Sequence, residues 1–240
     1  MTGAAFSYNK SMKMRYKKKF AAIAVALFLF IGMTAGLVLF VSVGGQGYAR
    51  VSFSKSYYFL VKDCEETTAT AVSGDIYSAG GAGYFLEKDN AVAIACYFKE
   101  TSAESVRKNL EEKGTETRLV VRSPKDLVLR GSKSAYKAQI EGNLETVDSI
   151  AHILYDTANG LERSELSQRE AKAALSGVVS SLRGLIESNA GNLFALWNAG
   201  LKEAERKGTE LNGGILFAKD LRYLQTMLCD KSVNLTNYFN

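Results

Sequence analysis

Apolar residues are spread unevenly along the chain, and the longest uninterrupted run lies near the N-terminus. Residues 20–43 form 24 consecutive positions without a charged side chain. About 20 such residues span the hydrocarbon core of a bilayer as a helix. Lysines 17–19 precede the run, whereas the first charge beyond it is Arg50. The pattern predicts one transmembrane helix, with a cytoplasmic N-terminus and an extracytoplasmic remainder at the cell membrane. A cleaved signal peptide is the alternative, with an apolar stretch of about 7–15 residues.

The next pattern is an internal duplication within residues 56–122. Residues 57–72 align with residues 91–106 at an offset of 34 positions, so that Glu66 matches Glu100. Each copy starts with a short apolar run typical of a strand and continues with apolar residues at helical spacing. A glycine that suits a helix C-terminus and a second strand follow. Two such units predict a βαββαβ, ferredoxin-like domain in which both helices cover one face of a four-stranded sheet.

After this segment the apolar positions repeat at spacings of three and four, which indicates helices. Thr101 with Glu104 and Ser167 with Glu170 match the capping-box pattern of a helix start. Asn159 and the following glycine predict the end of a helix. The fold class predicted is α+β, with a C-terminal helical hairpin or small bundle. The predicted organisation is a basic tail at 1–19, a transmembrane helix at 20–43, a linker at 44–55, the βαββαβ domain at 56–122, a linker at 123–134, a helical region at 135–230 and a tail at 231–240.

Charge and chemistry narrow the possible functions. The net charge is +5, but residues 1–19 alone carry +6, so the remainder carries −1 and offers no basic surface for nucleic acid. Neither a cofactor nor a metal is expected, because His152 is the only histidine and the cysteines form no C-x-x-C pair. The favoured interpretation of Cys64, Cys96 and Cys229 is that they are small buried hydrophobic residues. His152 lacks a nucleophile at a defined spacing, so the chain is expected not to be an enzyme.

The duplicated segment resembles a known family. The run YYFLVKDC at 57–64, the Gly81–Tyr84 entry to a strand and the strand–helix segment 91–114, with its Phe98, are similar to a SPOR domain. This domain is the peptidoglycan-binding module of bacterial cell-division and sporulation proteins. The resemblance covers 67 of the 240 residues. It implies non-catalytic binding of glycan strands stripped of stem peptides, at sites of septation or sporulation, with division or sporulation proteins nearby.

Candidate binding residues follow from the alternation of side chains along strands. Tyr57, Phe59 and Val61 share one strand face, and we expect Phe59 and Val61 to lie in the core beneath the two helices. The other face would then be open to a glycan. The candidate residues on that open face are Tyr58, Leu60, Lys62, Tyr84, Val92 and Ile94.

Several alternatives stay open at this point. Tyr58 and Tyr84 could be ordinary, partly buried strand aromatics, and Lys62 could be a solvated lysine. Val92 and Ile94 would make an apolar patch, which tends to mark an interface. That interface could be the helical region of the same chain. The alternative function is an envelope adaptor that makes protein–protein contacts through its αβ domain and its C-terminal helices.

Overall fold

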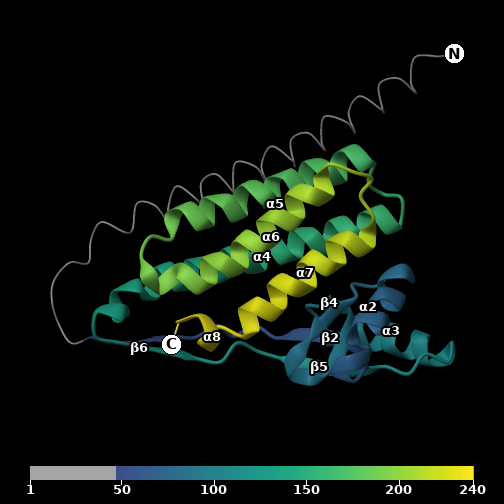
Figure 1. Ribbon diagram of the computed structural model, residues 1–240, viewed down its shortest axis with the longest axis horizontal. Coiled ribbons are helices and arrows are strands. Elements are labelled where there is room, and N and C mark those ends of the chain that lie inside the picture. Colours follow the sequence, from purple (N-terminus) through teal and green to yellow (C-terminus); the bar gives the residue numbers. More distant parts are fainter. Residues whose placement is uncertain (1–46, 240) are drawn as a thin grey trace, which may run out of the picture. The chain divides into compact units, whose positions relative to one another are not determined.

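The structure is a computed structural model that describes residues 47–239. The predicted transmembrane helix at 20–43 and the basic tail at 1–19 lie outside these residues. Between residues 47 and 239, no helix is long and apolar enough to cross a membrane. The predicted fold class and the single-pass membrane localisation are therefore corrected: the part of the chain that the structure describes is an α+β fold without a membrane-spanning helix (Figure 1).

The duplicated segment forms a module of four strands and two helices, which we call the αβ module (residues 57–122). Its strands are antiparallel and lie in the order β3-β4-β2-β5, so the two central strands come from the starts of the two copies. This is the βαββαβ connection expected of two strand–helix–strand units. The elements are β2 (Tyr57–Asp63), α2 (Ala69–Ser78), β3 (Tyr84–Leu86), β4 (Ala91–Tyr97), α3 (Glu100–Glu112) and β5 (Arg118–Arg122).

A β-bulge interrupts the pairing of the two central strands. Leu60 pairs with Ala95, whereas the next residue of β2 pairs with Ala93, and Ile94 is the extra residue. An extra residue shifts the alternation of the side chains that follow it. Cys96 therefore lies on the same face as Ala93, whereas strict alternation along β4 would place it on the face of Ile94.

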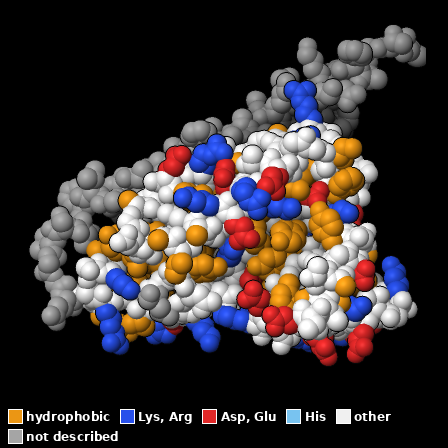
Figure 2. Space-filling model, viewed as in Figure 1, with side chains coloured by type: hydrophobic (Ala, Val, Ile, Leu, Met, Phe, Trp, Pro, Cys, Tyr) orange, Lys and Arg blue, Asp and Glu red, His pale blue; other side chains and the backbone are white. Residues whose placement is uncertain are grey.

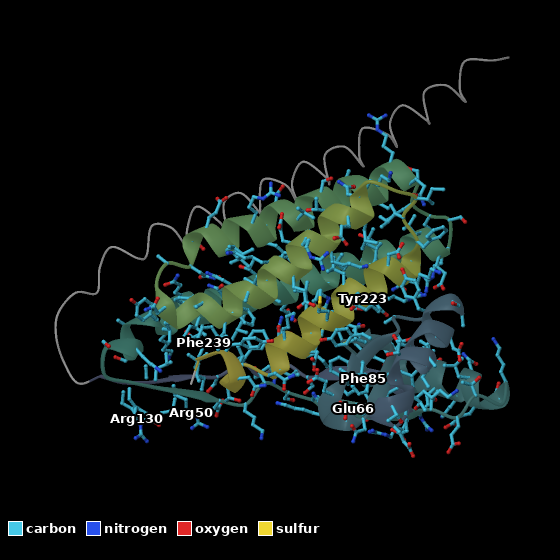
Figure 3. All side chains as sticks on the ribbon, in the orientation of Figure 1. Arg50, Glu66, Phe85, Arg130, Tyr223 and Phe239 are labelled. Atoms are coloured by element: carbon cyan, nitrogen blue, oxygen red, sulfur yellow. The ribbon has the colours of Figure 1, made fainter. Side chains whose placement is uncertain are left out.

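Both predicted linkers contain a strand. β1 (Tyr48–Val51) and β6 (Leu127–Arg130) pair antiparallel into a two-stranded ribbon. Val51, Leu127 and Leu129 are buried against the helices, whereas the alternate residues are exposed. Figure 3 shows the labelled arginines of this ribbon projecting away from the helices. The ribbon is thus a half-buried part of the fold.

Four long helices form the C-terminal region, with a short fifth helix at its end. They run side by side in Figure 1 and enclose a core that includes Ile140, Leu182 and Trp197. The first of them continues past the predicted stop at Asn159. The predicted tail is also helical, with Phe239 buried. The helices are α4 (Lys137–Glu162), α5 (Gln168–Ser188), α6 (Ala195–Asn212), α7 (Ala218–Val233) and α8 (Thr236–Phe239).

Both faces of the four-stranded sheet are covered. Helices α2 and α3 pack on one face, and α4 and α7 pack on the other. Phe59 and Val61 are fully buried as expected, but they face Ala151 of α4 and Cys229 of α7. The prediction of a sheet face open to a ligand is therefore wrong. Helices α2 and α3 cover the face that was expected to be open, and the helical region of the same chain covers the face of Phe59 and Val61.

Candidate functional site

The structure does not bring the predicted binding residues together on one surface. Leu60 and Val92 are completely buried, on the sheet face covered by α2 and α3. Tyr58 is half-buried in the same strand, and Lys62 is exposed near the strand's end. The buried pair cannot contact a polymer at the protein surface, so these residues do not form the predicted glycan site.

Tyr84 belongs to the contact between the sheet and α7. Its hydroxyl donates a hydrogen bond to the Asp230 carboxylate at 3.3 Å, and its ring lies edge-on to Tyr223 at 5.5 Å between centroids. Arg122 pairs with Asp230 at 3.2 Å and also pairs with Asp89. Burial raises the pKa of Asp230, although Arg122 opposes this shift. In Figure 2, apolar side chains gather over α7 above the αβ module, where Figure 3 labels Tyr223. Tyr84 therefore joins two layers of the fold.

A cleft of about 620 Å³ opens between the αβ module and the helical region. Ile94 is the one predicted binding residue that lines it. One wall is α3, the opposite wall is the C-terminal half of α4, and strand β4 lies between them. The lining residues are Ala79, Gly80, Gly81, Ile94, Ala95, Tyr97, Thr101, Ser102, Ser105, Val106, Leu110, Tyr155, Asn159, Glu162, Arg163 and Arg222.

Aromatic rings from both sides meet in this cleft. Tyr97, at the end of β4, lies edge-on to Tyr155 of α4, with 6.1 Å between the ring centroids. Tyr155 also lies edge-on to Phe98, which in turn stacks on His152 at 3.6 Å. Burial raises the pKa of Tyr97 to about 12, so its hydroxyl is neutral at physiological pH. The cleft therefore offers apolar ring surface together with neutral hydroxyl groups.

The polar groups of the cleft come from three elements. Arg222 of α7 donates a hydrogen bond to the Gly80 carbonyl at 3.1 Å and forms an ion pair with Glu162. It thereby links the turn before β3 to α4. On α3, Thr101 and Ser105 are one helical turn apart, so both hydroxyls line the same wall.

The turn before β3 requires glycine. Gly80 has a φ of +96°, which residues with a Cβ rarely adopt. A Cβ on Gly81 would lie 2.7 Å from the side chain of Ile76 and 3.2 Å from the carbonyl oxygen of Ile94. The glycines allow this turn to lie close to β4 at the edge of the cleft.

The single histidine does not belong to a recognisable catalytic set. His152 Nε2 lies 3.9 Å from the Asp148 carboxylate, which already accepts a hydrogen bond from Tyr57 at 3.0 Å and pairs with Lys55. Within residues 47–239, no group of three or more His, Cys, Asp or Glu side chains could hold a metal ion. The expectation that the chain is not an enzyme stays a prediction.

Ile94 is the only residue of the cleft lining that was predicted from the sequence. Tyr97 is the last residue of β4 and precedes α3, and Tyr155 lies beside the apolar stripe of α4. An aromatic residue beside the apolar stripe of a helix indicates a partly exposed ring. It does not indicate which other element of the fold that ring contacts. Arg222 lies 125 positions from Tyr97, so nothing local connects the two residues.

Comparison with known proteins found no relative of this chain. No protein-family model, no curated protein and no solved structure matches this chain. The resemblance to the SPOR domain therefore stays a prediction. The fold defines the class: an α+β protein whose βαββαβ sheet is enclosed between two layers of helices.

Proposed function

We propose that this chain is a non-catalytic glycan-binding protein and that the cleft between α3 and α4 holds a sugar strand. The observation that carries the proposal is the lining of the cleft: the Tyr97–Tyr155 pair beside the hydroxyls of Thr101 and Ser105. Binding sites are typically concave, with apolar and aromatic walls and a few placed polar groups. The proposed site differs from the open sheet face expected from the sequence.

The chemistry of a sugar strand fits these walls. Sugar rings have apolar faces that can lie against tyrosine rings, and their hydroxyl and acetamido groups both donate and accept hydrogen bonds. Asn159 can do the same, whereas Arg163 can only donate. Among the described residues, Arg163 has no ion-pair partner, so its guanidinium is available to a ligand. The polysaccharide that we propose is the glycan strand of peptidoglycan, in keeping with the resemblance of the αβ module to the SPOR domain.

The test is sedimentation of the purified full-length chain with peptidoglycan sacculi. We expect the protein to pellet with sacculi, to pellet more strongly after an amidase has removed the stem peptides, and to stay in the supernatant without sacculi. Ser105→Trp should fill the cleft and lower the affinity about tenfold or more, which corresponds to about 1.4 kcal/mol. Glu111→Trp is the matched control, because Glu111 is exposed on the same helix, on a side that does not line the cleft.

Two results would contradict the proposal. One is equal binding by the two tryptophan variants, which would place the binding surface elsewhere. The other is no binding to sacculi at all. In that case the adaptor function is favoured. Its first candidate surface is the turn between α6 and α7, where Ile215 is 71% exposed and Phe217 is 53% exposed.

A further inference from the structure

Two of the three cysteines lie together between the sheet and α7, although they are far apart in the sequence. Cys96 of β4 and Cys229 of α7 are both fully buried and belong to the same hydrophobic cluster. A hydrogen bond stabilises the contact between α7 and β4 at this point, because Gln225 of α7 donates to the carbonyl oxygen of Cys96 at 3.0 Å. Gln225 precedes Cys229 by one helical turn, so this face of α7 lies directly on β4.

We propose that Cys96 and Cys229 form an intramolecular disulfide when the protein meets a small-molecule disulfide oxidant. In the first step one protein thiol, as its thiolate, attacks the oxidant and forms a mixed disulfide, which releases one reduced oxidant thiol. In the second step the other cysteine displaces the remaining half. The two protein sulfurs lose two electrons in total, and the oxidant leaves as two thiols that take up the two protons.

Burial controls the rate of this reaction. Burial raises the pKa of Cys229 well above its ordinary value, so little thiolate forms while α7 is closed on the sheet. Exchange therefore requires a transient opening of the contact between α7 and β4. The rate should rise several-fold in urea concentrations below the unfolding transition, because urea favours opened states.

The experiment uses the full-length Cys64→Ser variant with oxidised glutathione. Cys64 is only half-buried and would react separately, so its removal leaves the proposed pair alone. We expect thiol titration to show the loss of both thiols, mass spectrometry to show the loss of two hydrogen atoms without bound glutathione, and peptide mapping to link the segments that carry Cys96 and Cys229. Closing so long a loop should also raise the urea midpoint relative to the reduced protein.

One control variant and two possible results test whether Cys96 and Cys229 form the disulfide. Cys64→Ser combined with Cys229→Ala should gain at most one glutathione and no internal bond. Retention of two free thiols in Cys64→Ser, after prolonged oxidation in low urea, would overturn the proposal. So would two bound glutathione molecules, because the sulfurs would then be unable to meet. The main comparison is between the reduced and the oxidised form of Cys64→Ser. It therefore does not depend on whether the control variant, which carries Cys229→Ala in the core, folds.

The Cys96–Cys229 disulfide would also restrict motion at the cleft between the αβ module and the helical region. Cys96 is next to Tyr97, and Cys229 lies two helical turns from Arg222, so the disulfide would hold both cleft residues in place. The proposal itself is independent of the ligand, since thiol loss and peptide mapping report the bond whether or not a glycan binds.

Discussion

At the scale of single residues, the contact between β2 and α4 contains a buried carboxylate with two donors. Asp148 of α4 is 2% exposed, and its carboxylate is satisfied by the hydroxyl of Tyr57 and by Lys55. A buried carboxylate that loses a donor keeps the cost of its lost hydration. The same hydrogen bond joins β2 to α4, so it supports the covered face of the sheet.

We therefore expect Tyr57→Phe to lower the free energy of unfolding by about 1–3 kcal/mol. Urea denaturation followed by circular dichroism would measure the change. Tyr58→Phe is the matched control, because Tyr58 is the half-buried neighbour and its hydroxyl has no hydrogen-bond partner among the described residues. Its effect should stay within about 0.5 kcal/mol. Equal losses in the two variants would show that the bond to Asp148 is not the source.

At the scale of elements, helix starts show what a short sequence pattern can and cannot predict. The capping box of Ser167 and Glu170 is confirmed at the start of α5. The second predicted box is wrong, because α3 begins at Glu100, so that Thr101 already lies inside the helix. The same four-residue pattern thus has two outcomes. In the structure α3 begins at Glu100, soon after β4 ends at Tyr97, and the four-residue pattern does not contain that information.

The confirmed box predicts a pH-dependent contribution to stability. Hydrogen bonds from the Ser167 backbone and side chain lower the pKa of Glu170 from its usual 4.5. A lowered folded-state pKa means that the contribution is present above pH 4.5 and is lost as the pH falls through the folded pKa. We expect Glu170→Ala to cost about 0.3–1.5 kcal/mol at neutral pH and progressively less in acid. Urea titrations across pH would measure this difference.

The control for this experiment is Glu187→Ala, an exposed residue near the other end of α5. It should change the stability by no more than about 0.5 kcal/mol. A constant cost of Glu170→Ala from neutral to strongly acidic pH would contradict the proposed role of the ionised carboxylate.

Two glycines of the αβ module provide a matched pair of substitutions. Gly83 has a φ of +63°, and a Cβ there would lie 2.7 Å from the carbonyl oxygen of Ser73. Gly74 lies within α2, with open space around the position of a Cβ. We expect Gly83→Ala to destabilise the protein by about 1–3 kcal/mol and Gly74→Ala to stabilise it by up to about 1 kcal/mol. Thermal unfolding would give the two signs, and a neutral Gly83→Ala would show that the turn can relax.

At the scale of the whole molecule, the internal duplication was enough to predict the order of strands and helices in the αβ module. The covering of the second sheet face could not be predicted in the same way. It depends on Ala151 and Cys229, which lie far along the chain in helices whose apolar stripes show no preferred partner. The bulge at Ile94 was also hidden, because a single extra residue leaves the apolar run of β4 unchanged. Strict alternation therefore assigned the strand faces incorrectly.

Because the sheet is enclosed on both faces, the αβ module should not fold alone. In isolated residues 56–122, the side chains of Phe59 and Val61 would lose α4 and α7 and meet water. Burying a side chain of this size contributes about 1.5–3 kcal/mol, a large share of the few kcal/mol available to so small a domain. We expect the isolated segment to show poor amide dispersion in its NMR spectrum, whereas residues 44–240 should unfold in one cooperative transition.

The matched comparison is the same segment with Phe59→Ser and Val61→Thr, which makes the uncovered face more polar. If solvent exposure of that face is what prevents folding, these substitutions should reduce aggregation of the isolated segment while they destabilise residues 44–240. A well-dispersed spectrum and a cooperative transition from the unmodified segment would contradict the expectation. The αβ module and the helical region would then be separable domains, and the contact between them would be a docking contact that can open to a ligand.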